Sequence, residues 1–268
     1  MDTSFIKGVV VPILTICDKD EKIDEAKQRA QVDYVIKGGV TGILAFGSNG
    51  EFYMLEEDEM ERGLKIMVDQ AAGRVPVYFG IGAISTKKSC RLAKMAVKNG
   101  APAVSVLQPM FLKPTEDELV EIAVETARTA KVFGIDPKVA YLSYSTLGSG
   151  KGEDVDKMRN AAQKAKDLAP DLLIAGEMQF DAAVSPRVAR TKCPGDPVAG
   201  SANTFIFPDI NAGNIGYKIA QRLGGFDAYG PIMLGLNAPI NDLSRGCNAS
   251  EVYLSLIHIS EPTRLDVI

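Results

Sequence analysis

Residues 41–51 read TGILAFGSNGE, an apolar run typical of a β-strand followed by a glycine-rich turn. Helical spacing precedes this run at 25–37 and follows it at 56–72, and each helical segment stops at glycine. The alternation continues outward, with strand-like runs at 8–15, 75–81 and 103–107 and a helical segment at 85–98. Strands that are apolar throughout and alternate with helices predict an α/β fold with a parallel sheet.

The same alternation runs through the rest of the chain, and no low-complexity linker interrupts it. Thr115 is a candidate N-cap for a helix over 116–133. Further helices are predicted at 154–168, 184–189 and 214–223, and strands at 139–143, 172–176, 204–207 and 232–235. Local patterning therefore predicts α/β structure throughout and marks no boundary between domains.

Composition excludes several classes of function. The 268 residues carry a formal net charge of −4, which favours neither nucleic acid nor an anionic membrane as a partner. No apolar run reaches the roughly 18–20 residues of a membrane-spanning helix. The start, MDTSFIK, lacks the layout of a secretory signal, so we expect a cytoplasmic protein.

The cysteines and the histidine exclude other chemistry. Four cysteines lie far apart without a CxxC pair, which predicts reduced thiols rather than a disulfide or zinc framework. The one histidine, His258, lies close to the C-terminus. A histidine triad or a histidine-ligated metal is therefore not expected, and we predict no metal site.

The turn at 47–51 is a first candidate site. In α/β proteins ligands bind at the C-terminal ends of strands. Backbone N–H groups of small residues and the Ser48 hydroxyl could bind an anion there, although a glycine-rich turn is more often only a connection.

The segments around this turn carry a resemblance. They read GVVVPILT (8–15), GGVTGILAFGSNGEFYMLEEDE (38–59), VPVYFGIGAISTKKSCRLAKMAVKNGAPAVSV (75–106) and QPMFLKPTEDEL (108–119). Together they resemble the dihydrodipicolinate synthase and N-acetylneuraminate lyase family. That family consists of (β/α)8 barrels that condense or cleave pyruvate through a lysine Schiff base. The resemblance covers residues 6 to about 118, less than half of such a barrel.

The resemblance places Ser48 and Asn49 in the loop that binds the pyruvate carboxylate. Asn49 departs from the usual hydroxyl residue, and Phe111 stands where many members carry a tyrosine of the proton relay. The Schiff-base lysine and the strand-5 tyrosine belong to the second half of the barrel, and no later strand-like run ends in lysine. The resemblance therefore implies a remnant of the pyruvate loop without its nucleophile.

Later segments resemble a second family. They read ELVEIAVETARTAKVFGIDPKVAYLSYSTLGSGKGEDVDKMRNA (118–161), SANTFIFPDINAGNIGYKIAQRLGG (201–225) and GPIMLGLNAPINDLSRGC (230–247). These resemble the phosphate acetyl/butyryl transferases, which are Rossmann-like α/β enzymes. The resemblance implies transfer of an acetyl group between coenzyme A and phosphate, with acetyl-CoA as substrate, no metal and no covalently bound cofactor.

Phosphate and coenzyme A are anionic, so their site needs cations and aimed N–H groups. The resemblance implies substrate-binding roles for Ser145, Thr146, Ser149, Lys151, Asn211, Gly213, Asn214, Asn241 and Asp242. The segment 211–216 is predicted to lead into a helix whose N-terminus can hold an anion. An ordinary polar turn at 145–152 remains the alternative interpretation.

The resemblance assigns catalysis to Ser244, Arg245 and Glu251. Ser244 and Arg245 would contact the acyl phosphate and thioester, and Arg245 would stabilise developing negative charge. Glu251 stands where the family has a basic aspartate, so its carboxylate is displaced by one methylene, a shift that can cost ~100-fold. A solvated surface charge is the alternative interpretation of Arg245.

The end of the chain has a resemblance of a different kind. Residues 254–264 read LSLIHISEPTR, which resembles a transposase sequencing adapter translated in frame. On this interpretation residues 254–268 are a non-native tail that replaces the final helix of the transferase family.

Three hypotheses follow. In the first, half of a (β/α)8 barrel (1–117) is joined within 115–123 to an incomplete Rossmann-like phosphate acetyltransferase domain (118–253), and neither reaction is catalysed. In the second, the chain is a functional phosphate acetyltransferase with an atypical N-terminal domain. In the third, it is a non-catalytic module that binds coenzyme A or phosphate. All three imply small-molecule partners (acetyl-CoA and phosphate, with pyruvate for the N-terminal parent), no nucleic acid, no membrane, and parent families that are homo-oligomeric.

Overall fold

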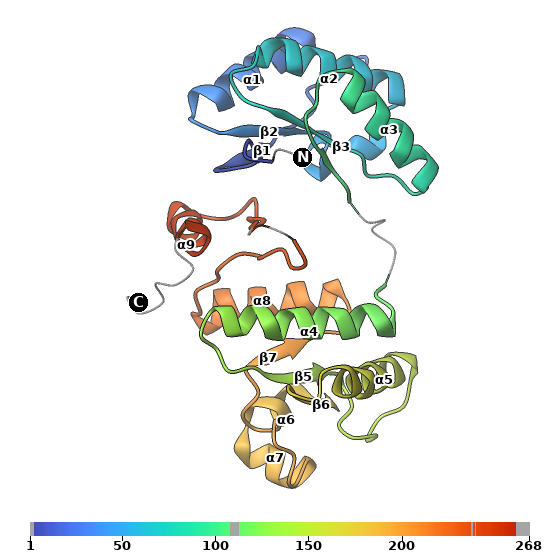
Figure 1. Ribbon diagram of the computed structural model, residues 1–268, viewed down its shortest axis with the longest axis vertical. Helices are drawn as coiled ribbons and strands as arrows, with labels where there is room; N and C mark the ends of the chain where they lie inside the picture. Colours follow the sequence, from blue (N-terminus) through green and yellow to red (C-terminus); the bar gives the residue numbers. More distant parts are fainter. Residues whose placement is uncertain (1–2, 108–112, 237, 239, 261–268) are drawn as a thin grey trace. The chain divides into compact units, whose positions relative to one another are not determined.

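The computed structural model describes residues 3–107, 113–236, 238 and 240–260 (Figure 1). The chain divides into two compact units, Met1–Leu112 and Lys113–Ile268. The predicted α/β class is confirmed, because each unit contains a parallel sheet with helices. Among the described residues, no helix combines the length and the apolar character that a membrane crossing requires.

The first unit is built on a four-stranded parallel sheet in the order β1-β2-β3-β4. Its strands are β1 (Val10–Pro12), β2 (Gly42–Ala45), β3 (Val77–Gly80) and β4 (Val104–Ser105). The helices α1 (Glu25–Lys37), α2 (Glu57–Ala71) and α3 (Thr86–Lys98) connect them, and all three lie on one side of the sheet (Figure 1). Sequential parallel strands with helices on one side are the arrangement of the first half of a (β/α)8 barrel.

Each of these helices has a clear start signal. The Asp24 side chain accepts a hydrogen bond from the N–H of Lys27, and Ser85 accepts one from Lys88. The apolar faces then pack on the sheet around Phe79, which is fully buried and lies edge to face against Phe46 at 5.3 Å. The helices predicted from their spacing are thus also capped at their first turns in the structure.

The opposite face of this sheet is covered by few side chains. Tyr78 lies across Gly42, where an added Cβ would stand 2.6 Å from the tyrosine ring. Phe5 stacks on Tyr78 with the ring centroids 6.2 Å apart. On the same face, Leu14 is 56% exposed.

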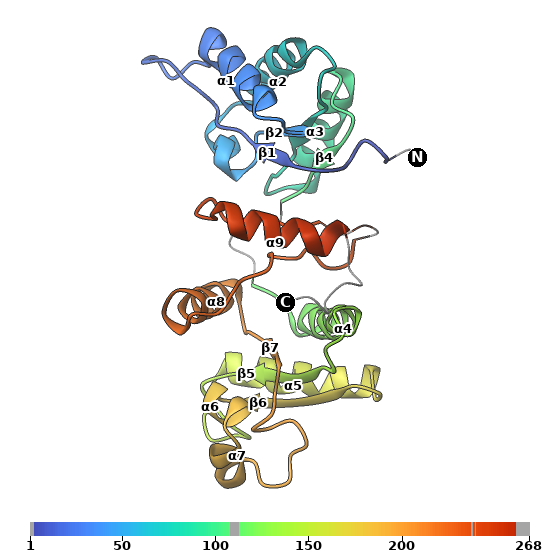
Figure 2. The same cartoon turned by 90° about the vertical axis from the view of Figure 1, so that its left-hand side faces the viewer.

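The second unit has a three-stranded parallel sheet in the order β6-β5-β7. Its strands are β5 (Lys138–Leu142), β6 (Leu173–Met178) and β7 (Thr204–Ile206). The helices are α4 (Glu116–Val132), α5 (Glu153–Leu168), α6 (Phe180–Val184), α7 (Pro186–Lys192), α8 (Ile210–Gly224) and α9 (Ala249–Ser260). In both views α4 and α8 lie on one side of the sheet, and α6 and α7 on the other (Figures 1 and 2).

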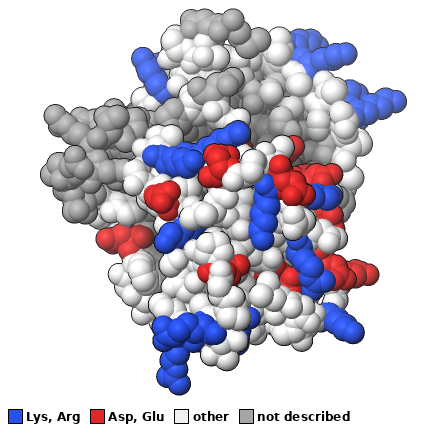
Figure 3. All heavy atoms as spheres, turned by 60° about the horizontal axis from the view of Figure 1, so that its bottom comes forward, with Lys and Arg blue, Asp and Glu red and all other residues white. Residues whose placement is uncertain are grey.

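Both faces of this second sheet are buried. One core joins α4 and α5 to the strands around Tyr141, whose hydroxyl donates to the carbonyl of Leu119 at 3.0 Å. The other core joins α6 and α7 to the opposite strand face around Met178 and Cys193. Burial raises the pKa of Tyr141 and of the Cys193 thiol, so both remain protonated near neutral pH. Outside the cores, Figure 3 shows cationic and anionic side chains intermixed on one face of the molecule.

Thr115 caps α4 as predicted, through a capping box with Glu118. The strand expected at 232–235 is wrong, since the structure has only an isolated bridge between Ile232 and Asn241 there. The helix expected at 184–189 corresponds to the end of α6 and most of α7. Helix α9 runs from Ala249 across residue 254 into the adapter-like segment, and the non-native origin of that segment stays a prediction.

Candidate functional site

The predicted pyruvate loop lies at the C-terminal end of β2. Ser48 and Asn49 belong to the short 3-10 turn Ser48–Gly50, where Ser48 is exposed and Asn49 is half-buried. Among the described residues neither side chain makes a hydrogen bond. The turn is fixed from the segment after β1 instead, since the hydroxyl of Thr15 donates to the carbonyl of Gly50 at 2.6 Å.

The neighbouring strand approaches this turn closely. A Cβ at Gly80 would stand 2.1 Å from the carbonyl oxygen of Phe46, so β3 has to end in glycine. The turn is therefore positioned by the first three strands, but the strands of the second unit end at Leu142, Met178 and Ile206 rather than at a lysine. Phe111, which stands where many members of the resembling family carry a tyrosine of the proton relay, lies outside the described residues.

The second candidate site is the loop 145–152, between β5 and α5. Ser145 is fully buried, donates to Glu177 Oε1 at 3.0 Å and accepts from the N–H of Gly150 at 2.9 Å. Thr146 is buried too, and its hydroxyl accepts from the N–H of Gln179 at 3.0 Å. Both hydroxyls that were predicted to contact substrate are thus used inside the protein, where they shape the loop.

The centre of this arrangement is Glu177, near the end of β6. Its carboxylate is 1% exposed and accepts from Ser145, from the N–H of Gly148 at 2.7 Å and from Arg159 Nε at 2.9 Å. Burial alone would raise the pKa of Glu177, but these hydrogen bonds outweigh it and hold the pKa below the ordinary value. Glu177 is therefore a buried, charged group that is fully partnered.

The outer part of the loop is exposed. Ser149 lies at the surface, although its hydroxyl oxygen accepts from the N–H of Thr146 at 2.9 Å. Lys151 is also exposed, and its carbonyl accepts from the hydroxyl of Tyr144 at 2.6 Å. The first turn of α5 carries Glu153, Asp154 and Asp156, so carboxylates stand beside the lysine. These charges oppose the binding of an anion at this helix N-terminus.

The third predicted segment, 211–216, does not lead into a helix but lies within one. The helix α8 begins at Ile210, and the Asp209 carboxylate caps it by accepting from the N–H of Ala212 at 2.9 Å. The predicted anion site at this N-terminus is thus already filled by a carboxylate. Asn211 and Asn214 are exposed and Gly213 is half-buried within the first turns of α8.

The predicted catalytic segment lies between α8 and α9. The Asn241 amide donates to the Ser255 hydroxyl at 2.7 Å and to the Ser255 carbonyl at 3.1 Å. Asp242, Ser244 and Arg245 are exposed, and the Ser244 hydroxyl accepts from the N–H of Gly246 at 3.3 Å. Within the described residues Arg245 makes no ion pair or hydrogen bond. The two groups predicted to contact the acyl phosphate thus face solvent.

Glu251, the predicted base, is held by structural contacts. One carboxylate oxygen accepts from Gln221 Nε2 at 2.8 Å and lies 3.5 Å from Arg222. The other accepts from the N–H of Asn248 at 3.0 Å, and Asn248 in turn accepts from the N–H of Glu251 at 2.9 Å. This reciprocal pair is a capping box at the start of α9. Both oxygens that would receive a proton therefore already accept hydrogen bonds.

The predicted site residues of the second unit are not bonded to one another across their segments. Across the residues that the structure describes, no hydrogen bond or ion pair joins 145–152 to 241–251, and neither Ser244 nor Arg245 is bonded to Glu251. In the same part of the chain, no histidine, cysteine, aspartate or glutamate side chains gather in threes as a metal site.

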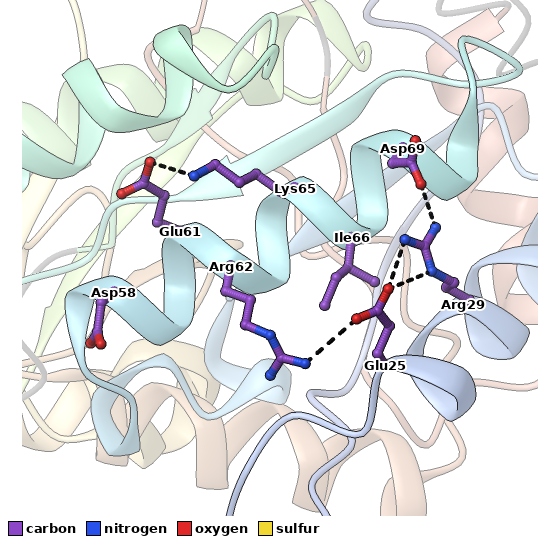
Figure 4. A pocket seen from close by; sticks show the side chains of 8 residues that line it. All are labelled: Glu25, Arg29, Asp58, Glu61, Arg62, Lys65, Ile66 and Asp69. Carbon is purple, nitrogen blue, oxygen red and sulfur yellow. Dashed lines mark hydrogen bonds and ion pairs between the residues drawn. The ribbon is translucent and has the colours of Figure 1, made fainter.

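A charged groove of about 520 Å³ lies on α1 and α2 of the first unit and contains none of the predicted site residues (Figure 4). Most of its charges are paired with one another: Arg29 lies 2.9 Å from Glu25 and 2.6 Å from Asp69, and Lys65 lies 2.9 Å from Glu61. The groove is lined by Glu25, Arg29, Asp58, Glu61, Arg62, Lys65, Ile66 and Asp69. Its place on the outer helices separates it from the strand ends where α/β proteins bind ligands.

Comparison with known proteins assigns most of the second unit to a protein family. The family model described as phosphate acetyl/butaryl transferase matches residues 108–259, more than half of the chain. The chain belongs to this family. The phosphate acetyltransferase of Bacillus subtilis (strain 168) is 56% identical over 147 residues, which cover 54% of this chain and 46% of the relative. The chain spans about half the length of such curated relatives.

Solved structures of the transferase family agree. A phosphotransacetylase from Streptococcus pyogenes has a TM-score of 0.53 and 39% identity, covering 91% of this chain and 77% of its own. The EutD phosphotransacetylase from Staphylococcus aureus has a TM-score of 0.52 and 37% identity, covering 88% and 75%. The Rossmann-like resemblance of the second unit is therefore confirmed.

The first unit matches a different family. The dihydrodipicolinate synthetase family model covers residues 5–131. The two family matches overlap at 108–131, a range that contains nearly all of α4. Resemblance to both families is thus confirmed, and their shared segment includes the range 115–123 in which we predicted the join.

Two residues of the transferase unit escaped sequence reasoning. Glu177 interrupts the apolar run LLIAGEM (172–178), and a charge inside a strand that is buried on both faces has to be paired. That signal could have identified Glu177, but its partner Arg159 lies on α5 and could not be named from spacing. Asp209 was readable as an N-cap, three residues before Ala212.

Proposed function

We propose that the chain joins a fragment of a phosphate acetyltransferase to a fragment of a pyruvate-dependent Schiff-base aldolase or lyase, and that it completes neither reaction. The parent transferase would move an acetyl group between coenzyme A and phosphate. The fragments would be residues 1–117 and 118–253, followed by a non-native tail from residue 254.

The observation that carries this proposal is that the polar groups of the transferase motifs are bonded within their own segments. Glu251 accepts from Gln221 and Asn248 in the α8–α9 connection, and among the described residues it has no bond to Ser244 or Arg245. Ser145 and Thr146 are buried in internal bonds, and the predicted anion site at α8 is capped by Asp209. Each of these contacts is structural, and none leaves a group aimed at a shared substrate.

The first unit supports the same conclusion. Its loop at Ser48 and Asn49 lies at the C-terminal end of a strand, as a barrel site requires. Schiff-base chemistry needs a lysine in a desolvated or cation-flanked position. The strands β5, β6 and β7 end without lysine, so the carboxylate loop has no nucleophile from the strands of the second unit.

Two assays test the proposal on the full chain. With acetyl-CoA and phosphate we expect no acetyl phosphate above the rate without protein, while the full-length B. subtilis relative serves as positive control. With pyruvate and borohydride we expect no mass increase from a trapped lysine adduct. Turnover in the first assay or an adduct in the second would refute the proposal.

A second candidate is a functional phosphate acetyltransferase with an atypical N-terminal unit. The observation in its favour is the match to the S. pyogenes phosphotransacetylase over 91% of this chain. If acetyl phosphate forms, Arg245→Ala distinguishes genuine turnover from contamination, because loss of the cation should lower kcat by at least about 100-fold. An unchanged rate in Arg245→Ala would exclude this candidate.

The third candidate is a binding module for coenzyme A or phosphate without catalysis. It is favoured by Arg245, which is exposed and makes no ion pair among the described residues. Calorimetric titration with coenzyme A tests it, with Arg245→Ala as the paired variant. Absence of heat at millimolar coenzyme A would remove this candidate and leave the first proposal unaffected.

A further inference from the structure

Glu177 in the second unit is a buried carboxylate that none of the predicted site roles includes. The first two residues of the loop 145–152 are both bonded to the end of β6: Ser145 to Glu177, and Thr146 to Gln179. A third bond runs from the N–H of Leu147 to the carbonyl of Glu177 at 3.1 Å. One strand end therefore determines the path of the loop on the neighbouring strand.

The loop needs this support because its backbone is unfavourable. Leu147 has φ 46°, in the left-handed region that a side chain disfavours, and Gly148 follows at φ 84°. The N–H of Gly148 donates to the Glu177 carboxylate at 2.7 Å, and the N–H of Gly150 donates to Ser145 at 2.9 Å. Hydrogen bonds to a charged acceptor are stronger than bonds to a neutral one, so a carboxylate suits this position.

We propose that Glu177 is the positioning residue of loop 145–152, holding the backbone that presents Ser149 and Lys151. The role of the loop in substrate binding rests on the proposed transferase origin, but the positioning does not. Arg159 completes the arrangement by neutralising Glu177 from α5 with two bonds, from Nε at 2.9 Å and Nη2 at 3.3 Å.

The neighbouring charged groups have partners of their own, and the Glu177 carboxylate accepts the hydrogen bonds from Ser145 and Gly148. Arg159 also pairs with Asp156 on its own helix at 3.0 Å. On the far side, Lys192 of α7 bonds Gln179 at 2.7 Å and Asp181 at 3.0 Å, so this pair stabilises the Thr146 contact rather than Glu177. Protonation of Glu177 would remove the charge that accepts from Gly148 and Ser145, and the loop would loosen while the strands stay paired.

Hydrogen exchange measured by mass spectrometry on the full chain tests the proposal. For Glu177→Gln we expect exchange in peptides spanning 145–152 to rise about tenfold, the scale of one lost bond to a charged group. Peptides from α4 should keep their wild-type rate. The matched control is Glu153→Gln, which removes the same charge at the start of α5 from an exposed side chain that makes no bond among the described residues.

Two further measurements keep the test decisive. Ser145→Ala retains the Glu177–Arg159 pair but removes the bond to Gly150, so it should raise exchange in the same peptides even if Glu177→Gln does not fold. As the pH is lowered, amide exchange of the wild-type loop, corrected for intrinsic rates, should rise before exchange of α4 does. In Glu177→Gln the corrected exchange of the loop should not rise in this pH range.

Equal loop exchange in wild type and both variants would overturn the proposal. A rise in loop and α4 together would also overturn it, because that pattern marks general destabilisation. None of these readouts needs turnover, so the proposal can fail while the proposed function stands, and the acetyl phosphate assay can fail while the loop result stands.

Discussion

The two units differ in how many faces of their parallel sheet are covered by helices. In the second unit helices cover both faces, with one core around Tyr141 and another around Met178. In the first unit all three helices lie on one face, and the other is covered mainly by Tyr78 and Phe5. Parallel sheets are stable when both faces are covered, so the second unit has a closed architecture and the first has that of an open half barrel.

The polar groups at the strand ends differ in the same way. In the second unit a buried carboxylate, Glu177, connects β6 to the loop after β5. In the first unit the loop after β2 is fixed by one hydroxyl, Thr15, and by the close approach of Gly80 to Phe46. Each of these two loops is therefore supported by contacts within its own unit.

The largest expected effect is the loss of unfolding free energy when a large core side chain is removed from one unit. Phe79→Ala should destabilise the first unit by about 3–5 kcal/mol, because the ring is fully buried against Phe46. Met158→Ala, at an equally buried position on α5, is the matched variant for the second unit. Urea unfolding followed by amide exchange in each unit should show each variant lowering only its own transition. If either variant lowered both transitions equally, the separation into two cores would be wrong.

The next effect concerns acid. The folded-state pKa of Glu177 is lowered, so the stability that it contributes is present above its unfolded value of about 4.3 and is lost as pH falls through the folded value. In Glu177→Gln, Gly148 and Ser145 lose their charged acceptor, which costs about 1–3 kcal/mol of local stability in the loop 145–152 near neutral pH, and this acid-dependent loss disappears. Amide exchange of the loop, measured between neutral pH and pH 3 with α4 as the reference, reports both effects. An unchanged acid dependence would place the titrating group elsewhere.

A smaller effect tests the adapter-like segment. Ser255 is 1% exposed and accepts from Asn241, so Ser255→Ala should cost about 1 kcal/mol and open the connection 241–248 to proteolysis. Ser250→Ala, an exposed neighbour on α9, should change nothing. Equal cleavage of both variants would mean that the segment from residue 254 is not integrated into the second unit.

The smallest effect belongs to the charged groove of the first unit. Arg29→Ala removes exposed pairs with Glu25 and Asp69, which are screened by salt and offset by side-chain entropy. We expect a change in unfolding midpoint close to the error of the measurement, vanishing at high salt. A large loss that persists in salt would show that the groove stabilises the first unit more than its exposure implies.

Much of this architecture could be predicted from residue patterns. Helices α1 and α4 begin where Asp24 and Thr115 cap them, and the parallel strands follow from short apolar runs between helices. Both family resemblances were visible in continuous motifs, and the family matches confirm them. The misplaced strand at 232–235 shows the limit, since an apolar run becomes a strand only if another strand is available to pair with it.

The predicted site was less accessible to sequence reasoning. Motifs named Ser145, Thr146 and Glu251 as groups that contact substrate, and the assignment of these roles stays a prediction. Their hydrogen bonds come from β6, α8 and the start of α9, segments whose distance from the motif in the chain gives no information about contact. A motif specifies which polar atoms are available, but the elements around it decide which of them remain free.

The amino-acid sequence alone determined the α/β class, the two parent families and most helix starts, because capping and apolar periodicity act between residues a few positions apart. Only the tertiary structure decided that one sheet is covered on both faces and the other on one, and that a carboxylate in β6 holds a loop after β5. Those outcomes depend on burial and hydrogen bonding between distant segments, and burial is a property of the folded chain rather than of any stretch within it.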